Sequence, residues 1–210
     1  MRDRLLAEPA PGVLVLAGTP QTWRQRLAVA TLCSNSAGAA GFQAAAALHG
    51  ADGFPETDLA LLLPSPRRIL YHGVTVHVGP FEEIDLTEVD GIRCTTIERT
   101  LCDLGSVTSA FLVGLAFEWY WRRTGDLDRL QQTVERLNRP GQRGTRLIQE
   151  FLGDARLKGV PTESGLEVRL EAILGEFEGR HPPPDGLRRA PTPPIATHPA
   201  QPRPRTEVRP

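Results

Sequence analysis

Two acidic residues in the C-terminal third of the sequence are spaced so that they could act together. Glu163 and Glu167 stand one turn apart on a helix expected over 162–177. Two-metal catalysis requires several carboxylates close to one another, and the 32 residues after Glu178 contain only two acids. We therefore interpret Glu163 as a first-turn acid that the helix dipole favours. The pair is a weak catalytic candidate, and we expect neither a catalytic group nor a cofactor.

The histidines and cysteines do not form a metal-binding motif. His49, His72 and His77 have irregular spacings and no cysteine or carboxylate at ligand distance in the sequence. The three cysteines lack CxxC spacing and are expected to be reduced thiols. We predict that no metal is bound, that His49 caps a helix end and that His77 points outward from a strand.

Arginines between 122 and 156 could form a basic stripe. The 24 basic and 25 acidic residues give a net charge of −1, and no segment is a strong polyanion-binding block. A solvated helix face is the simpler interpretation, and contact with nucleic-acid phosphates is the alternative. The candidates for such contact are Arg122, Arg129, Arg136, Arg143 and Arg146.

One short segment combines a predicted helix start with two residues spaced to form an ion pair. In DGIRCTTIERTLCDL, over 90–104, Arg99 and Asp103 are four residues apart, on one helix face. We interpret the pair as structural support, and the alternative is that Arg99 faces a partner or nucleic acid. A catalytic role is not expected, because arginine stays protonated near neutral pH.

The elements that must position these residues are strands first and helices later. Thr22 with Gln25, and Thr95 with Glu98, have the spacing of a capping box. Strands are expected over 12–17, 59–63, 74–78, 84–89 and 92–94, and helices over 22–34, 41–48, 95–104, 108–123, 126–137, 144–153 and 162–177. We expect 59–63 and 74–78 to pair as a hairpin. The prediction is an α+β fold with a small mixed sheet followed by a helical region.

The last segment, 179–210, differs in composition from the rest. Ten of its 32 residues are proline and almost none are apolar, which is typical of a disordered or polyproline-like tail. A frameshifted end is the alternative, since GC-rich DNA read out of frame yields protein rich in proline and arginine. No apolar run approaches the roughly 18 residues that cross a bilayer, so we expect a soluble, cytoplasmic protein without membrane contact.

Several stretches carry a resemblance to a known family. They are PGVLVLAGTPQTWRQRL over 11–27, AAALHG over 45–50, GVTVHV over 73–78, DGIRCTTIERTLCDL over 90–104 and PTESGLEVRL over 161–170. The chain resembles bacterial proteins related to the AbiEi-type antitoxins of type IV toxin–antitoxin systems. Many of these join an N-terminal winged helix to a nuclease-like domain similar to very-short-patch-repair endonucleases. The residues that match the family motif are Thr96, Arg99, Thr100 and Asp103.

The resemblance implies a division of the chain, with departures at both ends. It implies a winged-helix remnant over 1–20, of which we expect only the last strand, an α+β antitoxin-like domain over 21–105, a helical region over 106–178 and the proline-rich tail over 179–210. Family members usually begin earlier and often have histidine at the position of Phe42. The Asp and Glu-x-Lys strands of the nuclease-like domain do not follow. We expect a truncated chain.

The expected function is that of an antitoxin-like transcriptional regulator. It would bind DNA, a cognate toxin or a second copy, without catalysis. The alternative that the resemblance implies is a very-short-patch-repair type of DNA endonuclease. Only that alternative needs Mg²⁺, with Glu163 and Glu167 as the available acids.

Overall fold

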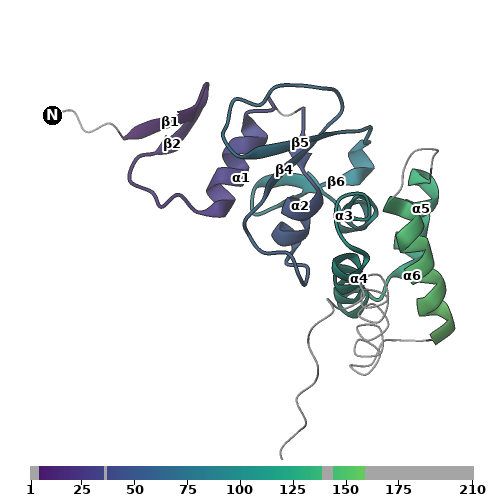
Figure 1. Cartoon of the computed structure of the whole chain (residues 1–210). Helices are drawn as coiled ribbons and strands as arrows, with labels where there is room; N and C mark the ends of the chain where they lie inside the picture. Colours follow the sequence, from purple (N-terminus) through teal and green to yellow (C-terminus); the bar gives the residue numbers. More distant parts are fainter. Residues whose placement is uncertain (1–4, 36, 139–143, 159–210) are drawn as a thin grey trace, which may run out of the picture. The chain divides into compact units, whose positions relative to one another are not determined.

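The computed structural model describes residues 5–35, 37–138 and 144–158. The expected helix over 162–177, the proline-rich tail, Glu163, Glu167 and Arg143 lie outside these residues. The described part contains two sheets and six α-helices, which confirms the α+β class (Figure 1). No helix in it is both long and apolar enough to span a lipid bilayer.

The smaller sheet is the antiparallel pair β1 and β2, with β1 over Leu6–Ala10 and β2 over Val13–Leu16. The strand predicted over 12–17 is present as β2, whereas β1 was not predicted, so only the expectation of a single strand is wrong. β1 escaped the sequence pattern because Glu8 and Pro9 interrupt its apolar alternation, and proline is tolerated only in edge strands. One face of this hairpin packs on the following helix through Ala10, Val13 and Val29.

The larger sheet has the strand order β5-β4-β3-β7-β6. Its strands are β3 over Ala39–Ala40, β4 over Leu59–Leu63, β5 over Val74–Val78, β6 over Leu86–Val89 and β7 over Ile92–Thr95. β4, the all-apolar LALLL segment, is buried along its whole length. β6 and β7 are antiparallel and are joined by a tight turn in which Asp90 (φ 49°) and Gly91 (φ 74°) are both left-handed.

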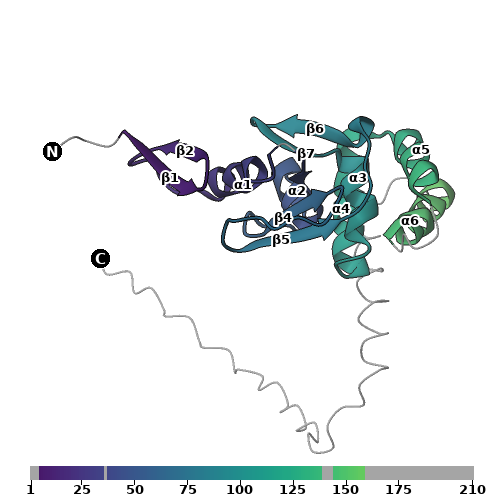
Figure 2. The ribbon, with the colours of Figure 1, turned by 90° about the horizontal axis from the view of Figure 1, so that it is seen from above.

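The predicted hairpin between β4 and β5 is wrong, because the two strands pair in parallel, from Leu59 beside Val74 to Leu63 beside Val78 (Figure 2). The connection over 64–73 returns to the start of β4 instead of turning back. Ten residues span at most about 33 Å, whereas a five-residue strand is only about 17 Å long. The connection is therefore long enough for a parallel crossover without a helix.

The helices begin and end largely where the capping signals predict. They are α1 over Trp23–Leu32, α2 over Phe42–His49, the 3₁₀ helix η1 over Glu83–Asp85, α3 over Ile97–Leu104, α4 over Ala110–Thr124, α5 over Leu127–Leu137 and α6 over Gly144–Lys158. The hydroxyl of Thr22 accepts from the N–H of Gln25, as expected for an N-cap. The cap of α3 is Thr96 rather than Thr95, because Thr95 still belongs to β7.

The core has two main clusters of buried side chains. One lies between the larger sheet and helices α1 and α2, and includes Leu27, Leu61 and Cys94. The other is helical and is centred on Leu101, Phe117 and Tyr120. Helix α3 contacts α2, α4, α5 and α6 (Figure 1), so the motif that it carries lies between the two clusters.

Candidate functional site

Arg99 is the centre of a buried polar network. Its side chain, 2% exposed, leaves the first turn of α3 and donates from Nε to Asp103 Oδ2 (2.8 Å). One terminal nitrogen, Nη1, donates to Asp85 Oδ2 (3.1 Å) and to the carbonyl oxygen of Pro80 (3.1 Å). The expected helix-face pair is therefore present, but it is buried and is joined by a second carboxylate.

Asp85 is the member of this network that the sequence did not reveal. It ends η1 and is 1% exposed, and its Oδ2 accepts from the N–H of Glu82 (2.9 Å). Its other oxygen, Oδ1, accepts from Arg136 on α5. In the sequence, the available signal for a buried carboxylate was that Asp85 stands between two apolar residues, Ile84 and Leu86. Its arginine partners could not be identified, because they lie 14 and 51 residues from Asp85 along the chain. We name Asp85, Arg99, Asp103 and Arg136 the arginine network.

The two carboxylates of the arginine network differ in acidity. Burial alone would raise the pKa of Asp85, but the hydrogen bonds from Arg136 and Glu82 and the charge of Arg99 outweigh it, so this pKa is lowered. Asp103 has Arg99 as its charged partner, and burial dominates, raising the pKa of Asp103 to about 6. Asp85 is thus the firmly ionised member of the pair.

The motif threonines complete the attachment of α3 to β7. The hydroxyl groups of Thr95 and Thr100 are hydrogen-bonded (2.6 Å), and Thr100 donates to the carbonyl oxygen of Thr96 (2.8 Å). All four motif residues, Thr96, Arg99, Thr100 and Asp103, therefore lie on one short helix and bond to groups of the fold itself. This geometry agrees with structural support.

His49 does not cap its own helix, contrary to prediction. Its Nε2–H donates to the carbonyl oxygen of Thr95 (2.8 Å), which ties the end of α2 to β7. Burial lowers the pKa of His49. The thiol of Cys94 lies 4.0 Å from this ring, but burial raises the pKa of Cys94 to about 12. A thiol of that acidity is protonated at neutral pH and is not an activated nucleophile.

His77 does not point freely outward either. It is half-buried, and its ring stacks on Phe42 with 3.9 Å between the centroids. Phe42 begins α2 with a left-handed backbone (φ 56°), which is uncommon for a bulky residue. The alternation in β5 showed two faces but could not show that Phe42, the first residue of α2, contacts His77. In the described part, no three histidine, cysteine or acidic side chains are grouped to hold a metal ion.

A further buried carboxylate, Glu98 of α3, is held by side chains of α4 and α5. Arg129 forms an ion pair with Glu98, with 3.0 Å between Nε and Oε1, and the hydroxyl of Tyr120 lies 3.3 Å from the same oxygen while donating to the carbonyl oxygen of Asp126 (2.8 Å). Burial raises the pKa of Tyr120 well above its usual value. Glu98 therefore fastens α4 and α5 to α3.

Of the arginines proposed as a phosphate-binding stripe, the four that the structure describes each pair with a carboxylate. Arg122 pairs with Asp52, Arg129 with Glu98, Arg136 with Asp85 and Arg146 with Glu150. Their partners come from different elements, and Arg136 is a member of the buried network. The structure does not bring these four side chains together as one exposed stripe.

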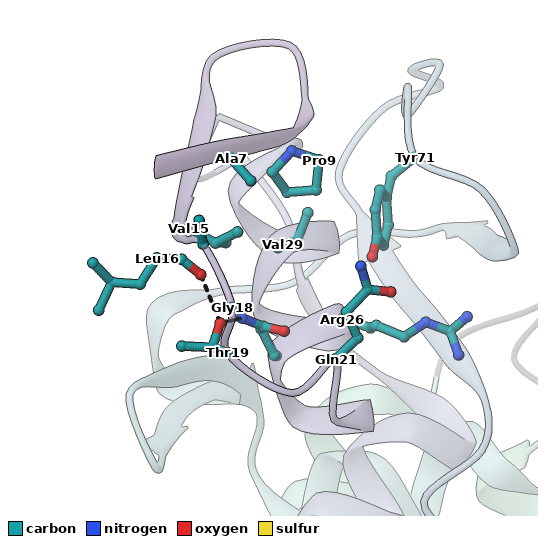
Figure 3. A pocket seen from close by; sticks show the side chains of 12 residues that line it. Ala7, Pro9, Val15, Leu16, Gly18, Thr19, Gln21, Arg26, Val29 and Tyr71 are labelled. Atoms are coloured by element: carbon teal, nitrogen blue, oxygen red, sulfur yellow. Dashed lines mark hydrogen bonds between the residues drawn. The ribbon is translucent and has the colours of Figure 1, made fainter. Parts of the chain in front are cut away.

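Another surface of the described part carries arginines without carboxylate partners. It is made by β1, β2, α1 and the connection over 64–73, and we name it the hairpin end. Arg26, Arg67 and Arg68 lie here and have no carboxylate partner within the described residues. A cavity of about 90 Å³ opens between the hairpin and α1 (Figure 3). Leu16 and Thr19 are on one side of it, and Tyr71 and Arg26 are on the other.

Exposed apolar side chains gather at the same hairpin end. Among the described residues, nine large apolar side chains are exposed, and six of these belong to it: Leu5, Leu6, Leu14, Leu16, Leu32 and Leu70. Sequence reasoning missed this surface, because the arginines and leucines come from separate segments and have no common spacing. Comparison with models of known protein families finds no match to this chain, and comparison with curated proteins finds none either.

Proposed function

We propose that this chain is an antitoxin-like, transcriptional-regulator-like protein that acts in the cytoplasm by binding DNA or a partner protein and does not itself catalyse a reaction. The observation that supports this most is the distribution of charge. The charged groups of the motif are buried and matched inside the fold, whereas unmatched guanidinium groups and exposed leucines share one surface.

The motif has the properties of a scaffold rather than of a reaction centre. A general acid or base must be within hydrogen-bond reach of its substrate. Asp85, Arg99 and Asp103 are all less than a tenth exposed and bond to one another. A binding role for the surface fits this arrangement better, since exposed apolar patches and unpaired cations are features of recognition sites.

The resemblance of the sequence to AbiEi-type antitoxins supports the choice of partners. It favours regulatory DNA or a cognate toxin, and it leaves a second copy of the chain as a further candidate. The endonuclease alternative depends on Glu163 and Glu167, which lie outside the described residues, and on Mg²⁺. We therefore keep it as an outcome of the test.

A gel-shift titration tests DNA binding by the full chain. The probe is the duplex upstream of the gene, with a shuffled duplex as control, each at about 50 mM and 200 mM salt. We expect preference for the upstream duplex and weaker binding at the higher salt, because phosphate contacts release counterions. Failure to bind either duplex at both salts, together with no enrichment of any peptide in a selection on the full chain, would overturn the proposal.

A nicking assay separates the enzyme alternative from the binding proposal. Supercoiled plasmid is incubated with the full chain and Mg²⁺, and Glu163→Gln serves as the matched variant. We expect no nicking by either protein. Mg²⁺-dependent nicking that Glu163→Gln abolishes would replace the proposal with the endonuclease.

A further inference from the structure

Two arginines on α1 differ in whether they have an acidic partner. Arg24 contacts Glu56 (2.8 Å) and Asp90, whereas Arg26, two residues later on α1, lines the cavity and has no acidic partner in the described part of the chain. Arg26 is half-buried. A half-buried guanidinium without a counter-ion is poised to accept a carboxylate or another anion, because that charge is already partly removed from water.

Two further cations come from the connection between β4 and β5. Arg67 donates to the carbonyl oxygen of Ser34 at the end of α1 (3.1 Å), which fixes its position without neutralising its charge. Arg68 is exposed. The same connection returns to Arg26, since a Cβ on Gly73 would lie 3.7 Å from Arg26 Nη2. Arg26 therefore lies on α1 and Arg67 contacts its end, and Arg68 follows Arg67 in the same connection.

The cavity that Arg26 lines, between α1 and the hairpin, has apolar walls from Ala7, Pro9, Val15 and Val29. Its volume of about 90 Å³ is roughly that of three liquid water molecules. That is far below the 300–1,000 Å³ of typical small-molecule sites. It suits one aliphatic side chain of a larger partner better than a separate metabolite.

The outer face of the hairpin adds an apolar surface beside the cavity. Leu6 lies opposite Leu16 in the strand register, and Leu14 is two residues before Leu16, so all three share one face. They are 49%, 63% and 60% exposed. The hairpin's carboxylate, Glu8, accepts from the N–H of Gly12 at the turn. The surface is thus apolar on the hairpin and basic on the neighbouring connection.

We infer that the hairpin end is a docking site for a segment of a partner protein that carries carboxylate side chains next to aliphatic ones. This deepens the proposed function and rests on it. The carboxylates would pair with Arg26, Arg67 and Arg68, and an aliphatic side chain would enter the cavity. Charge complementarity of this kind sets the choice of partner and the rate of association.

Two other occupants fit the surface less well. Protein–nucleic acid interfaces are much more polar and positively charged than protein–protein interfaces, so a face of exposed leucines is not suited to one. A symmetric dimer would place the same patch of each copy against the other. The three unpaired arginines would then approach the identical set, and like charges oppose such contact.

A selection from a random peptide library tests the inference without assuming a sequence. Phage displaying random 12-residue peptides are selected on the immobilised full chain, and the most enriched peptide is synthesised with a fluorescent label. We expect enriched peptides to carry Asp or Glu beside Leu, Ile or Phe. Replacing all three arginines, in Arg26→Ala, Arg67→Ala and Arg68→Ala together, should weaken binding of that peptide at least about tenfold.

Matched variants show whether the loss belongs to this surface. Arg146→Ala removes an exposed cation on α6, and Leu157→Ser removes an exposed leucine there, so neither should alter peptide affinity. Leu14→Ser together with Leu16→Ser should weaken it. Circular dichroism confirms that each variant is folded, which we expect because the three arginines have no ion pair within the described residues.

The outcomes distinguish this inference from the proposed function. Enrichment of basic peptides, no enrichment, or an affinity that the triple variant leaves unchanged would overturn the docking site. If the triple variant instead abolishes binding of the upstream duplex, nucleic acid is the occupant, the inference is overturned and the proposed function stands. If neither peptide nor duplex binds, both are overturned.

Discussion

The arginine network and the hairpin end contain the same kind of side chain in opposite surroundings. In the network, Arg99 and Arg136 meet two carboxylates that come from η1 and α3. At the hairpin end, Arg26, Arg67 and Arg68 meet none among the described residues. A guanidinium that is matched inside the fold fastens elements together, whereas one left unmatched at the surface is available to a partner.

The energetic consequences of the two arrangements differ as well. A buried ion pair is costly to break, because the remaining partner keeps an uncompensated charge in a medium of low polarity. An exposed cation contributes little to folding, since water already solvates it. Variants should therefore affect the stability of the protein in the first region and its binding in the second.

The largest effect is expected from Arg99→Met, which tests whether the network holds the fold together. In this variant Asp103 would lose its arginine partner, and Asp85 would keep only Arg136. We expect the free energy of unfolding to fall by about 3–5 kcal/mol, measured by urea denaturation. Arg68→Met is the matched control at the hairpin end, because Arg68 is exposed, and it should change this free energy by less than about 0.5 kcal/mol. Equal losses in the two variants would remove the distinction between the regions.

Gly144→Ala should also be strongly destabilising, since it disturbs the docking of α6 on the helix that carries the network. A Cβ at Gly144 would collide with the carbonyl oxygen of Cys102, and one at Gly105 would lie 2.7 Å from the carbonyl oxygen of Gly144. Backbone must move to relieve such a contact, at a cost of about 2–3 kcal/mol.

Gly153→Ala, on the same helix, is the control for Gly144→Ala. Nothing lies within 4 Å of a Cβ there, so the variant should be more stable by about 0.8 kcal/mol through helix propensity alone. Thermal unfolding of both variants measures the contrast. A destabilised Gly153→Ala together with an unaffected Gly144→Ala would contradict the close approach of α3 and α6.

The pH dependence of stability should reveal the unequal acidity within the network. The folded pKa of Asp103, about 6, lies above its ordinary value of 3.8. The folded state therefore binds this proton more tightly than the unfolded state and loses that advantage as pH rises from 4 to 6. The stability of the wild type relative to Asp103→Asn should fall by roughly 2 kcal/mol across this range.

Comparison with Asp103→Asn isolates this residue. Asp85 and His49 have lowered pKa values, so their contributions weaken as pH falls, but they titrate in both proteins and cancel in the difference. Urea titrations at pH 4, 5, 6 and 7 give the required values. A difference that rises with pH would mean that Arg99 outweighs burial at Asp103.

The smallest effect on stability is expected at the hairpin end. Leu14→Ser removes an exposed side chain from the outer hairpin face and should change the free energy of unfolding by less than about 0.5 kcal/mol. Val29→Ser, on the face of α1 that packs against the hairpin, should cost more, because Val29 contacts Ala10 and Val13. Chemical denaturation of the two variants sharpens the difference between a packed face and a face left for a partner.

Much of the secondary structure could be predicted because its causes are local. Thr22 caps α1, Gly50 ends α2 with a left-handed backbone, and Asp90-Gly91 forms the turn between β6 and β7. Each depends on residues only a few positions apart. The parallel pairing of β4 and β5 could not be read in the same way, because hydrophobic alternation identifies a strand but not the direction in which it pairs.

The candidate site likewise has a part that local sequence predicts and a part that it does not. The sequence by itself placed Arg99 and Asp103 four residues apart on one helix, and so determined that they could pair. Tertiary structure alone decided that the pair is buried and that Asp85 and Arg136 join it. It also decided that Arg26, Arg67 and Arg68, near exposed leucines, have no carboxylate partner among the residues it describes. The physical reason is that electrostatic matching depends on distance in space and on burial, and the order of residues along a chain specifies neither for groups that are far apart in sequence.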